Sequence, residues 1–113
     1  MEDNIHAYEI DFMIPNEFTV GCTKLKVEIV DRIANTEVLG NMCLAEGKIT
    51  IAKSADGVPQ CDSSMTNTFF HELTHAVLDS IGEKELSSNE RFVCAFSSTL
   101  AQAITTMKFN QNQ

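Results

Sequence analysis

Hydrophobic and polar residues alternate along part of the N-terminal half of the chain. In TKLKVEIVDRI, residues 23–33, Leu25, Val27 and Ile29 are interleaved with lysines and a glutamate. Successive side chains of a strand point to opposite faces of a sheet, so a period of two is typical of a strand with one buried face. We therefore expect a half-buried strand in this segment.

Two shorter strands are predicted after it, in ANTEVLGNMCLAEG and KITIAKS. The turn-forming pair Glu46–Gly47 lies between them, which favours a hairpin. Another strand or edge segment is expected in YEIDFMIP, residues 8–15, which ends at a proline. Gly57 and Pro59 indicate that SADGVPQCDSS, residues 54–64, is a loop.

The C-terminal half has the three-and-four spacing of two amphipathic helices. The first is predicted to be capped by Asp62, Ser63 or Ser64 and to end at Gly82. Its apolar positions are Met65, Phe69, Leu73, Ala76, Val77 and Ile81. The second is predicted to begin after ELSSNE, with apolar positions at Phe92, Val93, Phe96, Leu100, Ile104 and Met107. The final FNQNQ is expected to be a frayed polar tail.

Together these elements predict an α+β fold, in which a three- or four-stranded, largely antiparallel sheet packs on two main helices. A length of 113 residues is enough for one modest core, so residues 1–113 are expected to form a single domain. Hydrophobic residues make up 43% of the chain and charged residues 21%, which is typical of a folded globular protein.

The charge of the chain restricts its partners. A net charge of -8 argues against non-specific binding to nucleic acid or to an anionic membrane surface, because both are polyanions. No apolar run approaches the roughly 20 residues needed to cross a bilayer. The acidic N-terminus MEDNIHAYEID differs from a secretion signal, so a cytoplasmic location is expected, in the host cell if a phage encodes the chain. In that compartment the four cysteines are predicted to be free thiols: Cys22, Cys43, Cys61 and Cys94.

The segment FFHELTH contains two of the three histidines of the chain, four residues apart. On a helix, His71 and His75 lie one above the other on the same face. Both can reach one Zn²⁺ at about 2.0–2.1 Å, the usual zinc–imidazole distance. Glu72 then emerges beside the ion, where it can act as the general base that takes a proton from water. The motif therefore predicts a metal-dependent hydrolase, although a chance polar stripe on a helix remains an alternative.

A catalytic zinc site uses three protein ligands, so a third must come from elsewhere. No further histidine follows His75, which excludes the arrangement H-E-x-x-H-x-x-G-x-x-H. Asp79 would lie about 12 Å from His71 along the helix axis, which is too far. The better candidate is Glu90, near the start of the second helix, because a turn at Gly82 would bring that start back beside the first helix.

Three alternatives to Glu90 as the ligand stay open. Ser87-x-x-Glu90 also matches a capping box, in which Glu90 would bond only the backbone of its own helix. Glu83 and Glu85 lie in the same connection and could also supply a carboxylate. These readings make different predictions about whether Glu90 faces the two histidines.

With these residues identified, the sequence resembles a zinc-dependent metallopeptidase of the gluzincin type. FFHELTHAVLDSIGEKELSSNERFVCAF is similar to the minimal zincins encoded by phages and prophages, which are distantly similar to anti-repressor zinc peptidases. The resemblance implies that His71, His75 and Glu90 bind zinc and that Glu72 is the catalytic base. It also implies a peptide or protein substrate. Larger gluzincins have a supporting carboxylate at the position of Cys94, and this chain does not.

Two functions of other classes compete with the peptidase. The chain could be a zincin-like regulatory or interaction module that binds metal without turnover, because a chain of this size has few residues to line a substrate cleft. It could also hold a closed structural zinc, with Cys61 or Cys94 as fourth ligand. Glu72 favours the enzyme, because a structural zinc has no need of a general base.

Overall fold

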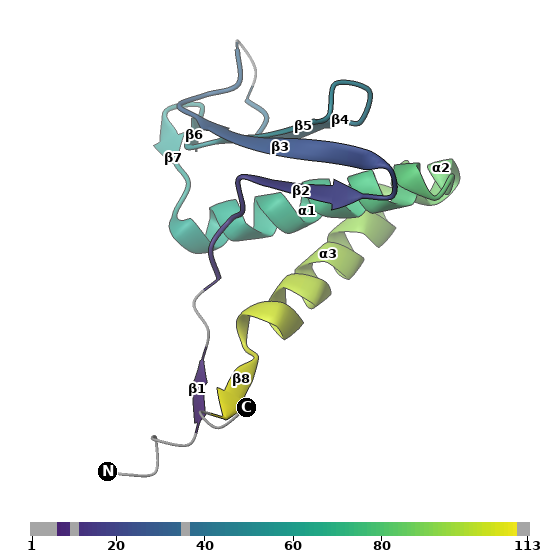
Figure 1. The fold of residues 1–113 in the computed structure, drawn as a ribbon. Helices are drawn as coiled ribbons and strands as arrows, with labels where there is room; N and C mark the ends of the chain where they lie inside the picture. Colours follow the sequence, from purple (N-terminus) through teal and green to yellow (C-terminus); the bar gives the residue numbers. More distant parts are fainter. Residues whose placement is uncertain (1–6, 10–11, 35–36, 111–113) are drawn as a thin grey trace.

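The computed structural model describes residues 7–9, 12–34 and 37–110. Within these residues the main body has three layers, in which helix α1, Asp62–Ser80, lies between a sheet and helix α3, Glu90–Thr105 (Figure 1). The α+β class is therefore as expected. No helix of the described part of the chain is long and apolar enough to span a membrane.

The main sheet is mixed and has four strands in the order β2-β3-β5-β4. Its strands are β2 Glu17–Val20, β3 Thr23–Val30, β4 Gly40–Cys43 and β5 Lys48–Ala52. The β2–β3 and β4–β5 pairs are antiparallel, and β4–β5 is the predicted hairpin. However, β3 pairs with β5 in parallel, so the expectation of a largely antiparallel sheet is corrected to a mixed one. This order places β5, where Ile49, Ile51 and Ala52 are fully buried, inside the sheet and leaves β4 at an edge.

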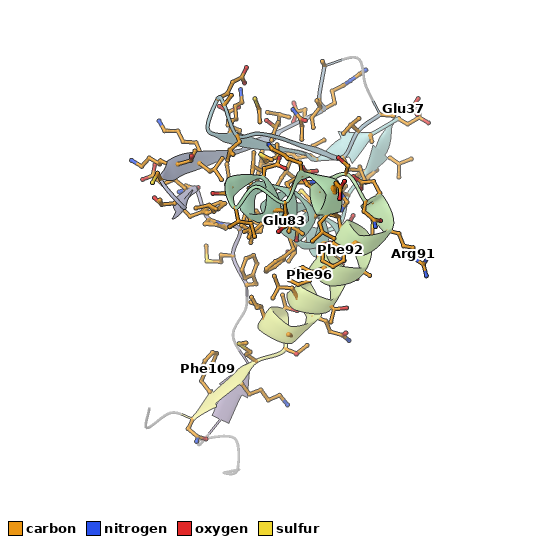
Figure 2. The ribbon with its side chains drawn as sticks, turned by 90° about the vertical axis from the view of Figure 1, so that its right-hand side faces the viewer. Glu37, Glu83, Arg91, Phe92, Phe96 and Phe109 are labelled. Atoms are coloured by element: carbon orange, nitrogen blue, oxygen red, sulfur yellow. The ribbon has the colours of Figure 1, made fainter. Side chains whose placement is uncertain are left out.

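Two short ribbons lie outside the main sheet. Strands β6, Ser54–Ala55, and β7, Val58–Pro59, pair within the segment that was predicted to be a loop. Strands β1, Ala7–Glu9, and β8, Lys108–Asn110, form an antiparallel ribbon away from the main body, and β8 carries Phe109 (Figure 2). Phe109 and Asn110 are therefore in a strand and not in a frayed tail. Of the strand predicted over residues 8–15, only the start is in β1; 10–11 lie outside the described residues.

The predicted end of α1 is confirmed, but its predicted cap is not. Cys61 precedes α1 and caps it without a side-chain hydrogen bond, so the predicted cap at Asp62, Ser63 or Ser64 is wrong. At the other end, Gly82 has a φ of +83° and allows the Glu83 N–H to donate to the Leu78 carbonyl at 2.8 Å. Gly82 therefore ends α1 as expected.

A short helix, α2, Lys84–Ser87, was not predicted and connects α1 to α3. Helix α3 then begins at Glu90, and its cap is Asn89, whose side-chain oxygen accepts a hydrogen bond from Phe92 N–H at 3.1 Å. The connection from α1 to α3 thus consists of the turn at Gly82, the four-residue helix α2 and the cap residue Asn89. It returns the start of α3 to the side of α1.

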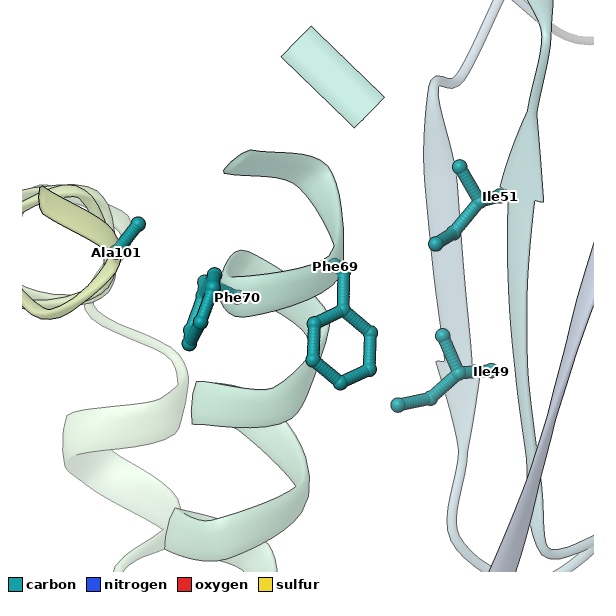
Figure 3. Packing of buried hydrophobic residues seen from close by; sticks show 5 residues of the cluster. All are labelled: Ile49, Ile51, Phe69, Phe70 and Ala101. Carbon is teal, nitrogen blue, oxygen red and sulfur yellow. The ribbon is translucent and has the colours of Figure 1, made fainter. Parts of the chain in front are cut away.

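The core lies on both sides of α1. Phe69 points toward Ile49 and Ile51 of β5, whereas the adjacent Phe70 points toward Ala101 of α3 (Figure 3). All five side chains are at most 3% exposed. Burial of one large apolar side chain contributes about 1.5–3 kcal/mol, so these neighbouring phenylalanines fix α1 against both layers. His71, the next residue along α1, and His75, about one turn further, are thereby held in place.

Gly40 allows the edge strand β4 to approach α1 closely. A Cβ at Gly40 would lie 2.5 Å from Thr68 Cγ2 and 3.0 Å from Glu72 Oε2. Gly40→Ala is therefore expected to lower the free energy of unfolding by about 1–3 kcal/mol, the usual cost of overpacking. Denaturant unfolding measures this change.

A second substitution, Thr68→Ser, tests whether this contact is the cause. It removes Cγ2 but keeps the hydroxyl that donates to Gln60 Oε1 at 2.9 Å. The double variant should recover part of the stability lost in Gly40→Ala, because the nearest clash is gone. If Gly40→Ala unfolds like the parent, the close approach of β4 to α1 does not constrain the fold.

Candidate metal centre

Three side chains from two helices converge at the start of α3. His71 and His75 lie one turn apart on α1, with ring centroids 5.0 Å apart. Glu90, the first residue of α3, faces both: its Oε1 lies 3.3 Å from His71 Nε2 and its Oε2 lies 3.3 Å from His75 Nε2. One ligand atom from each residue lies within 4.8 Å of the others.

The donor set and its spacing fit a divalent cation. Two ligands of a tetrahedral zinc, each at about 2.0–2.1 Å, are about 3.3 Å apart, which matches the separation of each imidazole nitrogen from Glu90. Two imidazoles with one carboxylate are a donor set found in catalytic zinc sites, and they also bind other first-row ions. The geometry therefore permits a metal at the three residues that the sequence singled out.

The rival assignments for the connecting residues do not match the structure. Ser87 ends α2 and Asn89 caps α3, so Ser87 and Glu90 do not form a capping box. Among the described residues, neither Glu83 nor Glu85 belongs to a cluster that could hold a metal. Asp79 is also outside the cluster, as the helix rise predicted, and pairs with Lys84 at 3.9 Å.

The other ring nitrogen of each histidine has its own side-chain partner. Ser87 Oγ lies 3.0 Å from His75 Nδ1. Cys94 Sγ lies 3.9 Å from His71 Nδ1, at the position where the resemblance implied a supporting group. Sequence reasoning missed Ser87, because nothing in its local pattern links it to a histidine twelve residues earlier.

The cysteines do not complete the cluster. Cys94 faces Nδ1 of His71, whereas the Nε2 of that ring faces Glu90. Cys61 lies at the start of α1, where its Sγ is 3.2 Å from Ser63 Oγ. All four cysteines are free thiols, as expected. The arrangement thus gives no support to a closed site with a thiolate as fourth ligand.

Glu72 is a buried carboxylate beside this cluster. It is 8% exposed, and its carboxylate makes no hydrogen bond or ion pair with the described part of the chain. Burial, and then the charge of Glu90, raise the pKa of Glu72 to about 7. Glu72 also lines the space beside the cluster, so its carboxylate is accessible from there.

The protonation state of His71 is compatible with its binding a metal. Burial, and then the charge of His75, lower the pKa of His71, and these effects outweigh the opposing effect of Glu90. His71 is therefore neutral at pH 7. A neutral imidazole is the form that binds a metal.

Two hollows meet at His71 and Glu72. One, of about 590 Å³, lies between the segment 37–40, the N-terminal half of α1 and α3. The other, of about 350 Å³, contains His75 and Glu90 and is bordered by β4. Neither is lined by lysine or arginine among the described residues, and Arg91 points away from the body of the molecule (Figure 2). We call these two hollows together the groove.

No protein-family model, curated protein or solved structure matches this chain. The likeness to zincins therefore depends on the motif residues alone. Fold class does not determine activity, so function has to be argued from the chemistry of the site.

Proposed function

We propose that this chain is a zinc-dependent peptidase in which His71, His75 and Glu90 hold the metal and Glu72 is the general base. The observation that carries the proposal is the position of Glu72. It is a buried carboxylate, it borders both parts of the groove, and it is adjacent in sequence to the proposed ligand His71. A metal with only a structural role would not need such a group.

The chemistry follows from the residues around the groove. A zinc ion bound there would supply Lewis acidity, which polarises a carbonyl and makes water a better nucleophile near neutral pH. The Glu72 carboxylate accepts a proton from the attacking water and then donates it to the leaving amine. Burial raises the pKa of Glu72 above its ordinary value, and the positive charge of a cation held by the neighbouring ligands would lower it again and favour the carboxylate that accepts the proton.

The edge strand beside the groove supports a peptide as substrate. The Ala52 N–H, at the end of β5, donates to the carbonyl of Leu39, the residue just before β4, at 2.9 Å. Bonded and non-bonded pairs alternate in an antiparallel ladder, so the backbone groups of Gly40 and Met42 point to the open side of β4. Both residues border the groove. An extended peptide could pair with this edge by strand addition.

Metal analysis together with a cleavage assay tests the proposal. Protein purified without a histidine tag is expected to bind a single zinc ion per chain and to cleave members of a mixed peptide library. A chelator should stop cleavage and added zinc should restore it. His71→Ala, the control, should lose both metal and activity.

The outcomes of this test separate the candidate functions. If the parent binds no metal even when zinc is supplied, the metal site and the peptidase are both wrong. If it binds zinc but cleaves no peptide or protein offered, the metal-binding regulatory module is the better description. A cytoplasmic location stays a prediction that this assay does not address.

A further inference from the structure

We infer that Ser87 is a positioning residue of the metal centre, which holds His75 with its proton on Nδ1 and leaves Nε2 available to the metal. This inference rests on the proposed metal site but not on peptide hydrolysis. It concerns a residue that the sequence pattern singled out only as one end of an alternative capping box.

The contact between Ser87 and His75 is short and shielded. Ser87 Oγ lies 3.0 Å from His75 Nδ1, and Ser87 is only 7% exposed. On the opposite side of the same ring, Nε2 lies 3.3 Å from Glu90 Oε2. The imidazole of His75 is therefore held between a hydroxyl at one nitrogen and a carboxylate at the other.

The proton on this ring decides whether the site can bind a cation. A neutral imidazole has one N–H donor and one acceptor nitrogen. When Ser87 Oγ accepts a hydrogen bond from Nδ1–H, the lone pair of His75 Nε2 points into the cluster. Histidines that bind metals usually donate their second N–H to such a partner, which fixes the orientation of the ring.

The local fold supports this role for Ser87. It is the only buried residue of α2, a helix of four residues. Asn89 already caps α3, so the Ser87 hydroxyl is not needed there. The Ser87 N–H donates to the Glu83 carbonyl at 3.0 Å, which anchors the backbone of Ser87 within the turn after α1. The connection thus presents one hydroxyl to one histidine.

The two histidines differ in how they are supported. The partner of His71 Nδ1 is Cys94, which is exposed, at a distance of 3.9 Å. The partner of His75 Nδ1 is the buried hydroxyl of Ser87 at a shorter distance. Water has little access to the buried Ser87 hydroxyl. Removal of that hydroxyl should therefore leave the Nδ1–H of His75 without a hydrogen-bond acceptor.

Zinc affinity of Ser87→Ala tests the inference, measured by competition with a chromophoric chelator. Loss of an outer partner of a metal ligand typically weakens binding about 10–100-fold, and we expect a change in that range. Ser97→Ala is the matched control. Ser97 is also buried, at 4% exposed, but its hydroxyl donates to the Cys94 carbonyl at 3.4 Å. Its zinc affinity should equal that of the parent.

Two further measurements separate positioning from a general effect on folding. The melting temperatures of the metal-free Ser87→Ala and Ser97→Ala proteins should be similar, and Ser87→Thr, which keeps the hydroxyl, should recover zinc affinity. An unchanged affinity in Ser87→Ala would overturn the inference and leave the metal site standing. A parent that binds no zinc would instead overturn the metal site.

Nitrogen-15 NMR of the parent keeps the inference testable even if Ser87→Ala fails to fold. In the zinc-loaded protein, the Nδ1–H proton of His75 should be protected from exchange with solvent, because the Ser87 hydroxyl accepts its hydrogen bond. A His75 Nδ1–H that exchanges as fast as an exposed imidazole N–H would show that Ser87 does not hold this proton.

Discussion

Glu72→Gln is expected to bind zinc like the parent and to hydrolyse peptides more slowly by a factor of about 10²–10⁴, the usual contribution of general acid–base catalysis. The glutamine side chain has nearly the same shape, so it fits beside Gly40 where the carboxylate now lies. It cannot accept a proton from water at neutral pH. Zinc stoichiometry and the rate of peptide cleavage are the measurements.

A matched control for this variant is Glu83→Gln, which makes the same chemical change at an exposed position before α2. It should leave both zinc content and cleavage rate unchanged. If Glu72→Gln cleaves at the parental rate, Glu72 is not the base. If it loses zinc as well as activity, Glu72 supports the metal site in a way that the distances do not suggest.

Glu90→Ala is expected to weaken zinc binding by more than the roughly 10–100-fold that loss of an outer partner costs, because a ligand itself is removed. The stability of the metal-free protein should change little. Glu90 is in the first turn of α3, where a carboxylate contributes only about 0.3–1 kcal/mol through the helix dipole, and Asn89 supplies the cap. Chelator competition gives the affinity, and thermal unfolding of the metal-free protein gives the stability.

Glu85→Ala serves as the control for Glu90→Ala, because it removes an exposed carboxylate from the neighbouring helix α2 without touching the cluster. Both its zinc affinity and its melting temperature should resemble those of the parent. The opposite pattern in Glu90→Ala, with an unchanged affinity and a clearly lower melting temperature, would mean that Glu90 acts only in helix stability.

Features that depend on short-range sequence pattern could be predicted. The helix that carries HELTH, the β4–β5 hairpin and the end of α1 at Gly82 all follow from periodicity or from turn chemistry within a few residues. The convergence of Glu90 with the two histidines could also be anticipated, because a short connection between helices returns the chain antiparallel.

Features set by long-range packing could not be predicted in the same way. The parallel pairing of β3 with β5 joins two strands that are separated in the sequence by β4, and no local pattern encodes it. The contact of Ser87 with His75 could not be predicted either, because it joins residues twelve positions apart on different helices and no local pattern links them. The pattern Ser87-x-x-Glu90 is typical of a helix start, but Asn89 caps α3 instead.

The placement of the three candidate ligands on two helices has a thermodynamic consequence. A cation held by His71, His75 and Glu90 would cross-link α1 to α3, two helices that also pack together in the core through Phe70 and Ala101. Binding to the folded chain alone adds about 2.7 kcal/mol at a free ligand concentration about 100 times Kd. The lifetime of this small protein against proteolysis in a cell would then rise and fall with available metal, which would couple its abundance to the ion it uses.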